Sequence, residues 1–496
     1  MPADARPMRL RELVCPYIHY LNTEPSIMLR LLRPSLLLAL SLLSPLTQAE
    51  EGAFRFASRP VAMQKKPGAV WVEQPTRVLT ATPDKADAIN QYGGSLDWPA
   101  ETASGFFRTQ KIDGRWWLID PEGRRFIQAG VASVTPMGNS ATAKAALAAQ
   151  FGDTAGWAQT TSAWLRDNGF NGAGAWSNSA FAKAEYRLPH ARIVNFMGDY
   201  GKQRGGVRQV PGHLGYPENA IFVFDPEFPA FAKQYAEALA QEAANPWLIG
   251  WFSDNEMPLY DKTLDGFLRL PAEDHGGREA RRWLAERQRR DTPDIAAITK
   301  DDRLAFVGHV YATYLRIVST ALRRADPHHL YLGSRLHSDE LRNPQVWQAA
   351  GQYVDVVSVN FYRDWAPAAS LLKDWEAWSG KPLMITEWYT KGEDSGLPNT
   401  TGAGWVVKTQ ADRGDHYQNF TLALLESTNV VGWHFFKYQD NDPAALNPEP
   451  SNIDANKGLV DVRYQPYAEL VSRARRVNQH KYGLIRRFSA ASRSAP

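Results

Sequence analysis

Cysteine is almost absent from this chain of 496 residues, and the one cysteine is Cys15. It precedes a segment that we predict to be a signal peptide, so the mature protein would contain no cysteine. Such a protein forms no disulfide, holds no metal through thiolates and has no cysteine nucleophile. The motif Asp440-Asn441-Asp442 is too weak a pattern to indicate a cation site. We therefore predict that the protein uses no metal and no other cofactor.

Strong net charge and long apolar runs are also missing. The net charge is +3, which is too small to indicate a nucleic acid or an anionic membrane as partner. The apolar run 36–43 is too short to span a membrane. It follows Arg30 and Arg33 and precedes Ala49, which predicts a signal peptide over 28–49 that is cleaved after Ala49. Residues 1–27 would then be an upstream extension, and the mature protein would be secreted or periplasmic; an N-terminal anchor helix is the alternative.

Aromatic residues are plentiful, with 17 tryptophans in the chain. Core packing accounts for many of them, because 44% of the residues are hydrophobic and the chain is long enough to bury a large core. Tryptophan faces also stack on the C–H faces of sugar rings while the sugar hydroxyls keep polar partners. A tryptophan-rich cleft would therefore suit a carbohydrate.

Apolar strand-like runs alternate with helical segments from residue 126 onward, which is typical of a parallel α/β fold. No glycine-rich phosphate fingerprint follows the first run, which disfavours a doubly wound open sheet. We predict a (β/α)8 TIM barrel over 126–475. Its eight strands are expected at 126–131, 169–174, 191–196, 247–256, 330–334, 354–360, 383–387 and 430–436.

Three segments lie outside this regular alternation. Residues 50–125 predict an extended segment with a β-hairpin near 107–126, packed on the barrel. Residues 257–303 predict a helical insertion after strand four. Residues 476–496 predict a basic C-terminal tail.

Two glutamates end predicted strands that are far apart in the sequence. Glu256 ends strand four and Glu387 ends strand seven. Active sites of such barrels lie at the carboxyl ends of the strands, so both side chains are expected at the same mouth. A pair of carboxylates across a small gap is what hydrolysis of a glycosidic bond requires, since one protonates the leaving oxygen while the other attacks or activates water.

Polar and aromatic residues at neighbouring strand ends complete the candidate site. Asn255 precedes the first glutamate, and strand six ends with Asn360 and Tyr362. Tyr362 could hydrogen-bond Glu387. Four further residues are candidates for the walls of sugar subsites, although for each single aromatic core packing is at least as plausible: Trp176, Trp388, Trp433 and His434. Asp254 is expected to fix a loop or a sugar hydroxyl.

The pattern resembles the large clan GH-A of retaining glycosidases, over roughly residues 107–475. Within that clan, strand seven and the residues after it look most like the β-agarases of glycoside hydrolase family 50. The segments that carry this resemblance are Ile385-Thr386-Glu387-Trp388 and residues 393–397, 401–402, 409–413 and 431–440. The resemblance implies that Glu387 is the nucleophile and Glu256 the acid/base of a double displacement on a polysaccharide or oligosaccharide.

Two other functions stay open on the sequence alone. A transglycosylase that remodels a bacterial glucan or exopolysaccharide would use the same two glutamates with a sugar acceptor. A non-catalytic sugar-binding barrel would bind without turnover, but retention of both glutamates counts against it. The glycine-rich segment 391–408 is expected to be either a mobile lid or a fixed rim loop.

Overall fold

The computed structural model describes residues 53–183 and 187–494. Cys15, the predicted signal peptide over 28–49 and its cleavage point lie outside the described residues. Within those described ranges, no helix combines the length and the apolar character that crossing a membrane requires.

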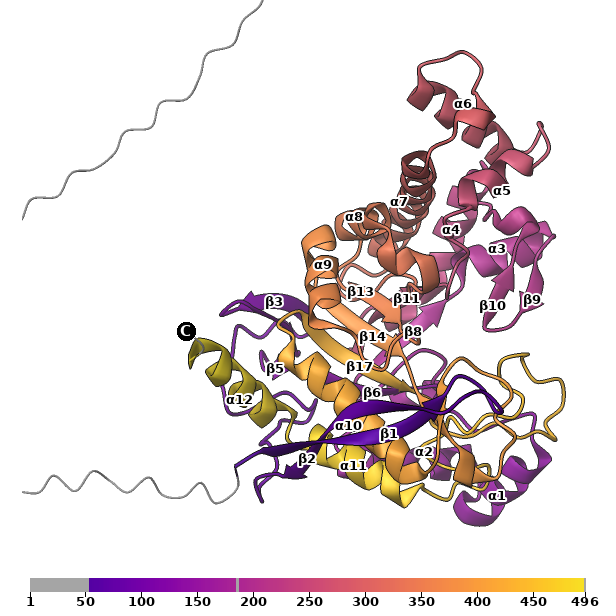
Figure 1. The fold of residues 1–496 in the computed structure, drawn as a ribbon. Helices are drawn as coiled ribbons and strands as arrows, with labels where there is room; N and C mark the ends of the chain where they lie inside the picture. Colours follow the sequence, from indigo (N-terminus) through magenta and orange to yellow (C-terminus); the bar gives the residue numbers. More distant parts are fainter. Residues whose placement is uncertain (1–52, 184–186, 495–496) are drawn as a thin grey trace, which may run out of the picture. The chain divides into compact units, whose positions relative to one another are not determined.

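Eight parallel strands form one curled sheet at the centre of the described structure (Figure 1). The strands are β6 Gln128–Ala132, β7 Gly172–Ala173, β8 His190–Val194, β11 Leu248–Ser253, β12 Leu330–Tyr331, β13 Val357–Asn360, β14 Leu383–Glu387 and β17 Val430–Phe436. Each predicted run contributes one of them. The first strand, β6, pairs with the last, β17. Just after β12 the chain pairs with β13 through a parallel bridge between Leu336 and Val359.

The neighbour order of the strands follows the chain order around the sheet. A doubly wound open sheet reverses its strand order at a switch point, so the structure excludes that alternative. The sheet is barrel-like, and the amide of Leu336 donates to the Ser358 carbonyl at 2.9 Å where its two ends meet.

Successive residues of the strands belong to two different apolar clusters, because side chains alternate between the faces of a sheet. One cluster contains Ile249, Leu330, Met384 and Val431. The other contains their sequence neighbours Leu248, Tyr331, Leu383 and Val430, together with apolar residues of the helices. Burial on both faces explains why the strands read as nearly continuous apolar runs.

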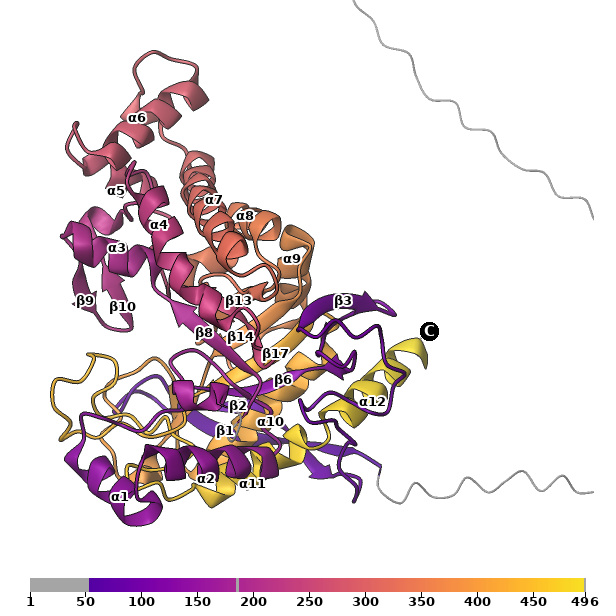
Figure 2. The ribbon, with the colours of Figure 1, turned by 180° about the vertical axis from the view of Figure 1, so that it is seen from behind.

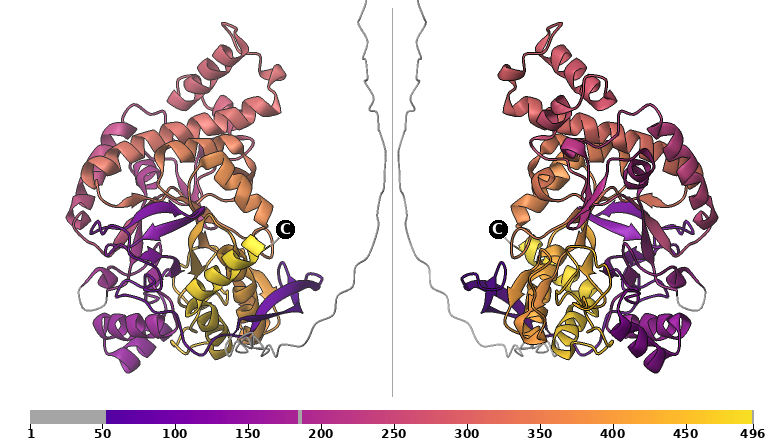
Figure 3. Two further views of the ribbon diagram at one scale, coloured as in Figure 1. Left: turned by 90° about the vertical axis from the view of Figure 1, so that its left-hand side faces the viewer. Right: turned by 90° about the vertical axis from the view of Figure 1, so that its right-hand side faces the viewer.

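Helices lie around the strands (Figure 3). They are α1 Ala141–Phe151, α2 Thr154–Asp167, α3 Phe196–Arg204, α4 Phe228–Glu237, α8 Pro344–Tyr353, α9 Ala369–Ser379 and α10 Gln410–Glu426. Between β7 and β8 the described residues contain only the short 3-10 helix Ser179–Ala182 instead of an α-helix. The helical insertion predicted after strand four comprises α5 Thr263–Arg269, α6 His275–Gln288 and the start of α7 Lys300–Ala325.

Two smaller sheets come from the segment that precedes the barrel-like sheet. β1 Arg55–Gln64 and β2 Val72–Ala81 form an antiparallel pair that packs on α10 (Figures 1 and 2). β3 Arg108–Ile112, β4 Arg115–Ile119 and β5 Arg125–Phe126 form a three-stranded antiparallel sheet.

The segment 391–408 is built into the first of these sheets. β15 Thr390–Gly392 pairs with β16 Trp405–Val407, and β16 pairs with β1. The buried Lys391 ammonium donates to the backbone carbonyls of Asn399, Thr401 and Gly402. These contacts favour the fixed rim loop over the mobile lid.

The C-terminal segment is a packed helix, which corrects the prediction of a basic tail over 476–496. After α11 Ala468–Asn478, the helix α12 Lys481–Ser494 follows. Tyr482, Leu484 and Ile485 are buried, and the Tyr482 hydroxyl donates to the Gly93 carbonyl at 2.7 Å. The prediction failed because the basic residues dominate the composition, whereas buried side chains in the first turns of α12 decide the packing.

We expect Leu484→Ala to lower the free energy of unfolding by about 2–5 kcal/mol, because it opens a cavity beneath α12. Arg487→Ala, on the exposed face of the same helix, should change it by less than about 0.5 kcal/mol. Urea denaturation of both variants checks this. Equal, small effects would show that α12 contributes no packing.

Candidate active site

The two glutamates predicted from the sequence are brought together by the amide of Asn360. Asn360 ends β13 and pairs in register with Glu387, the last residue of β14. Its Nδ2 lies 2.8 Å from Glu256 Oε1 and 3.2 Å from Glu387 Oε2. Glu256 follows the end of β11. One amide group at the carboxyl ends of three strands thus contacts both carboxylates.

Glu387 is the more strongly held of the two carboxylates. Its Oε2 accepts from Arg335 Nη2 at 2.6 Å as well as from Asn360, and its Oε1 accepts from the Tyr362 hydroxyl at 2.8 Å. The predicted hydrogen bond from Tyr362 is therefore confirmed. Burial raises the pKa of Glu387 to about 7; Arg335 acts against this shift, and the neighbouring Glu256 adds to it.

Arg335 is a site residue that the sequence analysis missed. It lies just beyond β12, its side chain is fully buried, and its Nε donates to Asn360 Oδ1 at 3.1 Å. The guanidinium lies 4.3 Å from the centroid of the Trp176 ring. Burial lowers the pKa of the Arg335 guanidinium, and the two glutamates oppose that shift. Its position directly after an apolar strand run, like those of the two glutamates, was the available signal.

The backbone is left-handed at several non-glycine residues that follow strands of the central sheet. These are Ser133, Trp176, Asp254, Glu256 and Arg335, with φ between 49° and 60°. Such conformations cost roughly 1–3 kcal/mol each and persist where the surroundings impose them. Their position at one end of the sheet makes this end the candidate site.

Asp254 and Asn255 hold the loops around Glu256. The Asp254 carboxylate accepts from the backbone amides of Met197 and Gly198 at the start of α3 and from the Tyr314 hydroxyl. Burial raises the pKa of Asp254 to about 6. Asp254 therefore fixes a loop, as expected. The Asn255 amide donates to the Gly212 carbonyl at 3.2 Å, and its Oδ1 accepts from Asn360.

Of the four predicted subsite walls, Trp176 alone borders the cavity. Trp176 is 38% exposed. Trp388 is 1% exposed and stacks on Phe420 at 4.1 Å between centroids, and Trp433 is fully buried with its indole N–H donating to the Tyr417 hydroxyl. Both predictions are wrong, because these side chains point away from the mouth toward α10.

The prediction that His434 lines a sugar subsite is also wrong. Its ring is fully buried and hydrogen-bonds Gln128 Oε1 at 2.8 Å. A Cβ at Gly174 would lie 2.5 Å from the ring, so the ring fills the space that this glycine leaves. Burial lowers the pKa of His434 to about 3. The side chain is part of the packed interior below the mouth and does not reach the cavity.

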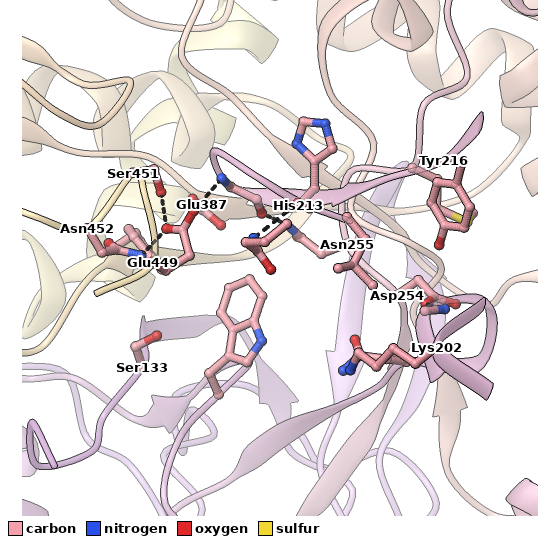
Figure 4. A pocket seen from close by; sticks show the side chains of 18 residues that line it. Ser133, Lys202, His213, Tyr216, Asp254, Asn255, Glu387, Glu449, Ser451 and Asn452 are labelled. Atoms are coloured by element: carbon pink, nitrogen blue, oxygen red, sulfur yellow. Dashed lines mark hydrogen bonds between the residues drawn. The ribbon is translucent and has the colours of Figure 1, made fainter. Parts of the chain in front are cut away.

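Two cavities, of about 350 Å³ and 710 Å³, meet at Glu387, Gly212 and Ser451. A hairpin of β9 Arg208–Val210 and β10 His213–Gly215 crosses between them. At its tip the Gly212 amide donates to Glu449 Oε1 at 2.7 Å. Ser451 and Asn452 also donate to Glu449, and Figure 4 shows Glu387, Asn255 and His213 on the same side of the pocket. The hairpin and the 449–452 loop thus form a bridge over the carboxylates.

Groups that could hold a metal need free ligand atoms. The Asp440 carboxylate already accepts from the Asn456 amide, the Gly458 backbone and the Tyr467 hydroxyl. A different group lies beside the first glutamate: His213, Glu256 and His337 offer ligand atoms that are all within 4.8 Å of one another. Glu340 raises the pKa of His337 to about 9 although burial acts against it.

The chain is similar in sequence to curated β-agarases. No family model matches it. β-Agarase B of Vibrio sp. (strain JT0107) is 25% identical and β-agarase A of the same strain 28% identical, each over 79% of this chain. These alignments cover 50% and 48% of those proteins, so the chain spans about half the length of the curated relatives it matches.

Solved structures agree with this relationship. The crystal structure of BpGH50 is 30% identical with a TM-score of 0.77, covering 88% of this chain and 98% of that one. The agarase AgWH50C has the same fold, with a TM-score of 0.67 at 23% identity over 81% of this chain and 67% of that one.

Replacing Arg335 should lower the free energy of unfolding by an amount that grows as the pH rises. In Arg335→Met the Glu387 carboxylate loses its cation, so its pKa rises further in the folded state. A group with a raised folded pKa destabilises the protein as the pH rises through that value. We expect the loss of unfolding free energy to be small near pH 5 and to reach about 3–5 kcal/mol near pH 9. Urea titrations across this range check it, with the exposed Arg342→Met as control; a loss that does not vary with pH would contradict the arrangement.

The two tryptophans should respond differently to truncation. Trp388→Ala removes a buried ring and should lower the free energy of unfolding by about 3–5 kcal/mol. Trp176→Ala removes a partly exposed ring that contacts the Arg335 guanidinium and Phe436, and should lower the free energy of unfolding by less than about 2 kcal/mol. Thermal and urea unfolding distinguish the two. A larger loss of unfolding free energy in Trp176→Ala than in Trp388→Ala would indicate that Trp388 lines the cavity.

Proposed function

Because this chain belongs to the GH50-like glycoside hydrolases, we propose that it hydrolyses β-glycosidic bonds of an agar-type β-galactan by double displacement. The observation that carries the proposal is the pair of carboxylates joined by the Asn360 amide at the mouth of the sheet. The proposal includes a closed (β/α)8 barrel of clan GH-A type, and export through the segment 28–49, since a polymeric substrate has to be met outside the cell.

Glu387 is the proposed nucleophile. Three donors, from Arg335, Asn360 and Tyr362, stabilise its ionised form. In the first step its carboxylate oxygen forms a bond to the anomeric carbon while the bond from that carbon to the leaving oxygen breaks. The Arg335 guanidinium keeps one carboxylate oxygen fixed, which leaves the other, held by Tyr362, to adjust as the new bond forms.

Glu256 is the proposed acid/base. Among the described residues Glu256 accepts from Asn360 alone, whereas Glu387 accepts from three groups. The more strongly held Glu387 is suited to attack, so in the proposed mechanism Glu256 gives a proton to the leaving oxygen and then removes a proton from the water that releases the sugar from Glu387.

The separation of the carboxylates supports retention of configuration. One nitrogen lies 2.8 Å from Glu256 Oε1 and 3.2 Å from Glu387 Oε2, so these two oxygens can be no farther apart than the sum of those distances. Inverting enzymes keep their carboxyl groups roughly 6.5–9.5 Å apart to make room for a water, and retaining enzymes about 5–5.5 Å. This upper limit lies below the range of inverting enzymes and includes the separation of retaining enzymes.

Removing each glutamate should affect a different step. We expect Glu256→Ala to lower kcat/KM on agarose by about 10²–10⁴-fold and Glu387→Ala to abolish turnover. With an activated aryl β-galactoside, azide should rescue both. It replaces the missing nucleophile in Glu387→Ala and gives the α-glycosyl azide, whereas in Glu256→Ala it attacks the glycosyl-enzyme and gives the β-glycosyl azide.

Product anomers are read by NMR, with the exposed Glu393→Ala as the matched carboxylate control. Swapped anomers would exchange the two roles. An active Glu387→Ala without azide would remove Glu387 from the chemistry, and binding of agarose without cleavage by the unmodified protein would favour a sugar-binding module.

A further inference from the structure

Two imidazoles flank Glu256, one from each neighbouring loop. His213 starts β10 in the hairpin that crosses the mouth, and His337 follows β12. The ring centroids lie 5.7 Å apart, and His213 Nδ1 lies 3.9 Å from Glu256 Oε2. The proposed hydrolysis assigns no role to either histidine. Their convergence on one carboxylate therefore calls for a separate explanation.

Each imidazole has a polar partner on its own side. The Tyr260 hydroxyl lies 3.4 Å from His213 Nε2. Glu340, which is 1% exposed, lies 3.6 Å from His337 Nδ1 through Oε1, which is an ion-pair contact longer than a hydrogen bond. Histidines that bind metals almost always have such an outer partner, because it fixes the ring orientation and raises the basicity of the ligand nitrogen.

A free nitrogen faces the carboxylate. His213 Nδ1 is buried and hydrogen-bonds none of the described residues. Its nearest charged neighbour is Glu256 Oε2. A buried polar atom without a hydrogen-bond partner is costly and calls for a function. With Nε2 directed at Tyr260, the lone pair available for coordination is on Nδ1.

We propose that His213, Glu256 and His337 form a binding site for a divalent transition-metal ion of the zinc class, and that occupancy of this site switches the enzyme off. Two imidazoles and one carboxylate are a ligand set that zinc uses with a fourth position left to water. The ligand atoms lie within 4.8 Å of one another. Bonds of about 2.0–2.2 Å in a tetrahedral site require ligand atoms roughly 3.5 Å apart, a contraction within the reach of side-chain rotation.

Cavities lead from solvent to this site, and carboxylates around it can balance the charge of the ion. Glu256 and His337 line the larger cavity, and His213 lines the smaller one. Asp339 also lines the larger cavity, and Glu340 is buried behind His337. A divalent ion therefore enters from solvent into a surrounding that is rich in carboxylates.

Inhibition follows from the role of Glu256. A metal on its oxygen takes the lone pair that must carry the proton to the leaving group. The first step then lacks its acid. The metal also fills the space between the bridge hairpin and the carboxylates, so substrate and metal should compete. The inhibition rests on the proposed function, whereas the metal binding rests on the residues alone.

The test measures metal binding and activity separately on the full chain. Zn²⁺ binding is followed by isothermal titration at about pH 8, since coordination displaces the imidazole proton. Co²⁺ is the spectroscopic probe, because a tetrahedral nitrogen–oxygen site gives visible absorption. We expect one ion per chain, at least tenfold weaker binding in both His213→Ala and His337→Ala, and roughly tenfold weaker binding in Tyr260→Phe.

His309→Ala is the matched control, because His309 pairs with Glu279 at 2.8 Å but lies outside the cluster. It should bind Zn²⁺ as the unmodified protein does. If no variant changes the affinity, or if no ion binds below about 1 mM, the site is overturned. If the ion binds as predicted but activity on agarose is unaffected by Zn²⁺ and EDTA, the metal site is supported and the proposed inhibition is contradicted. If the protein has no hydrolase activity, the binding result still decides the site.

Discussion

The buried contact between Arg335 and Glu387 is the constraint on which the rest of the site depends. A carboxylate removed from water costs several kcal/mol unless charge and hydrogen bonds replace its hydration. Here a fully buried guanidinium, an amide and a phenol supply that replacement. Breaking any one of these contacts would leave part of a buried charge without a partner. The arrangement therefore favours a single geometry in which the anion points into the cavity.

The curvature of the sheet makes this contact possible. The bridge between Leu336 and Val359 joins the chain after β12 to β13, and this places Arg335 beside Asn360 and Glu387. Left-handed backbone at Arg335 and Glu256 turns both side chains toward the mouth. The strain at these positions is offset by the surrounding packed sheet and helices. Fold and site are thus coupled through the ends of a few strands.

The sequence was sufficient for the parts that depend on pattern and strand position. Apolar runs located all eight strands, and their carboxyl ends located Glu256, Glu387, Asn360 and Tyr362. The sequence was insufficient where the direction of a side chain decides whether the residue lines the cavity. Trp388 follows Glu387 by one residue and therefore points to the opposite face, toward the helices. His434 lies deeper in the interior, in space that Gly174 leaves open. Arg335 was missed because a single arginine after a strand is usually a surface residue, and its burial follows from contacts distant in sequence.

The proposed mechanism requires that Glu387 attacks the sugar directly while Glu256 holds the proton. The most direct test is the anomeric configuration of the first product, followed by time-resolved proton NMR on an agar-derived oligosaccharide before mutarotation. Double displacement predicts that the newly formed reducing end appears first as the β-anomer. Appearance of the α-anomer first would show that water attacks in a single step and would contradict the role of Glu387 as nucleophile.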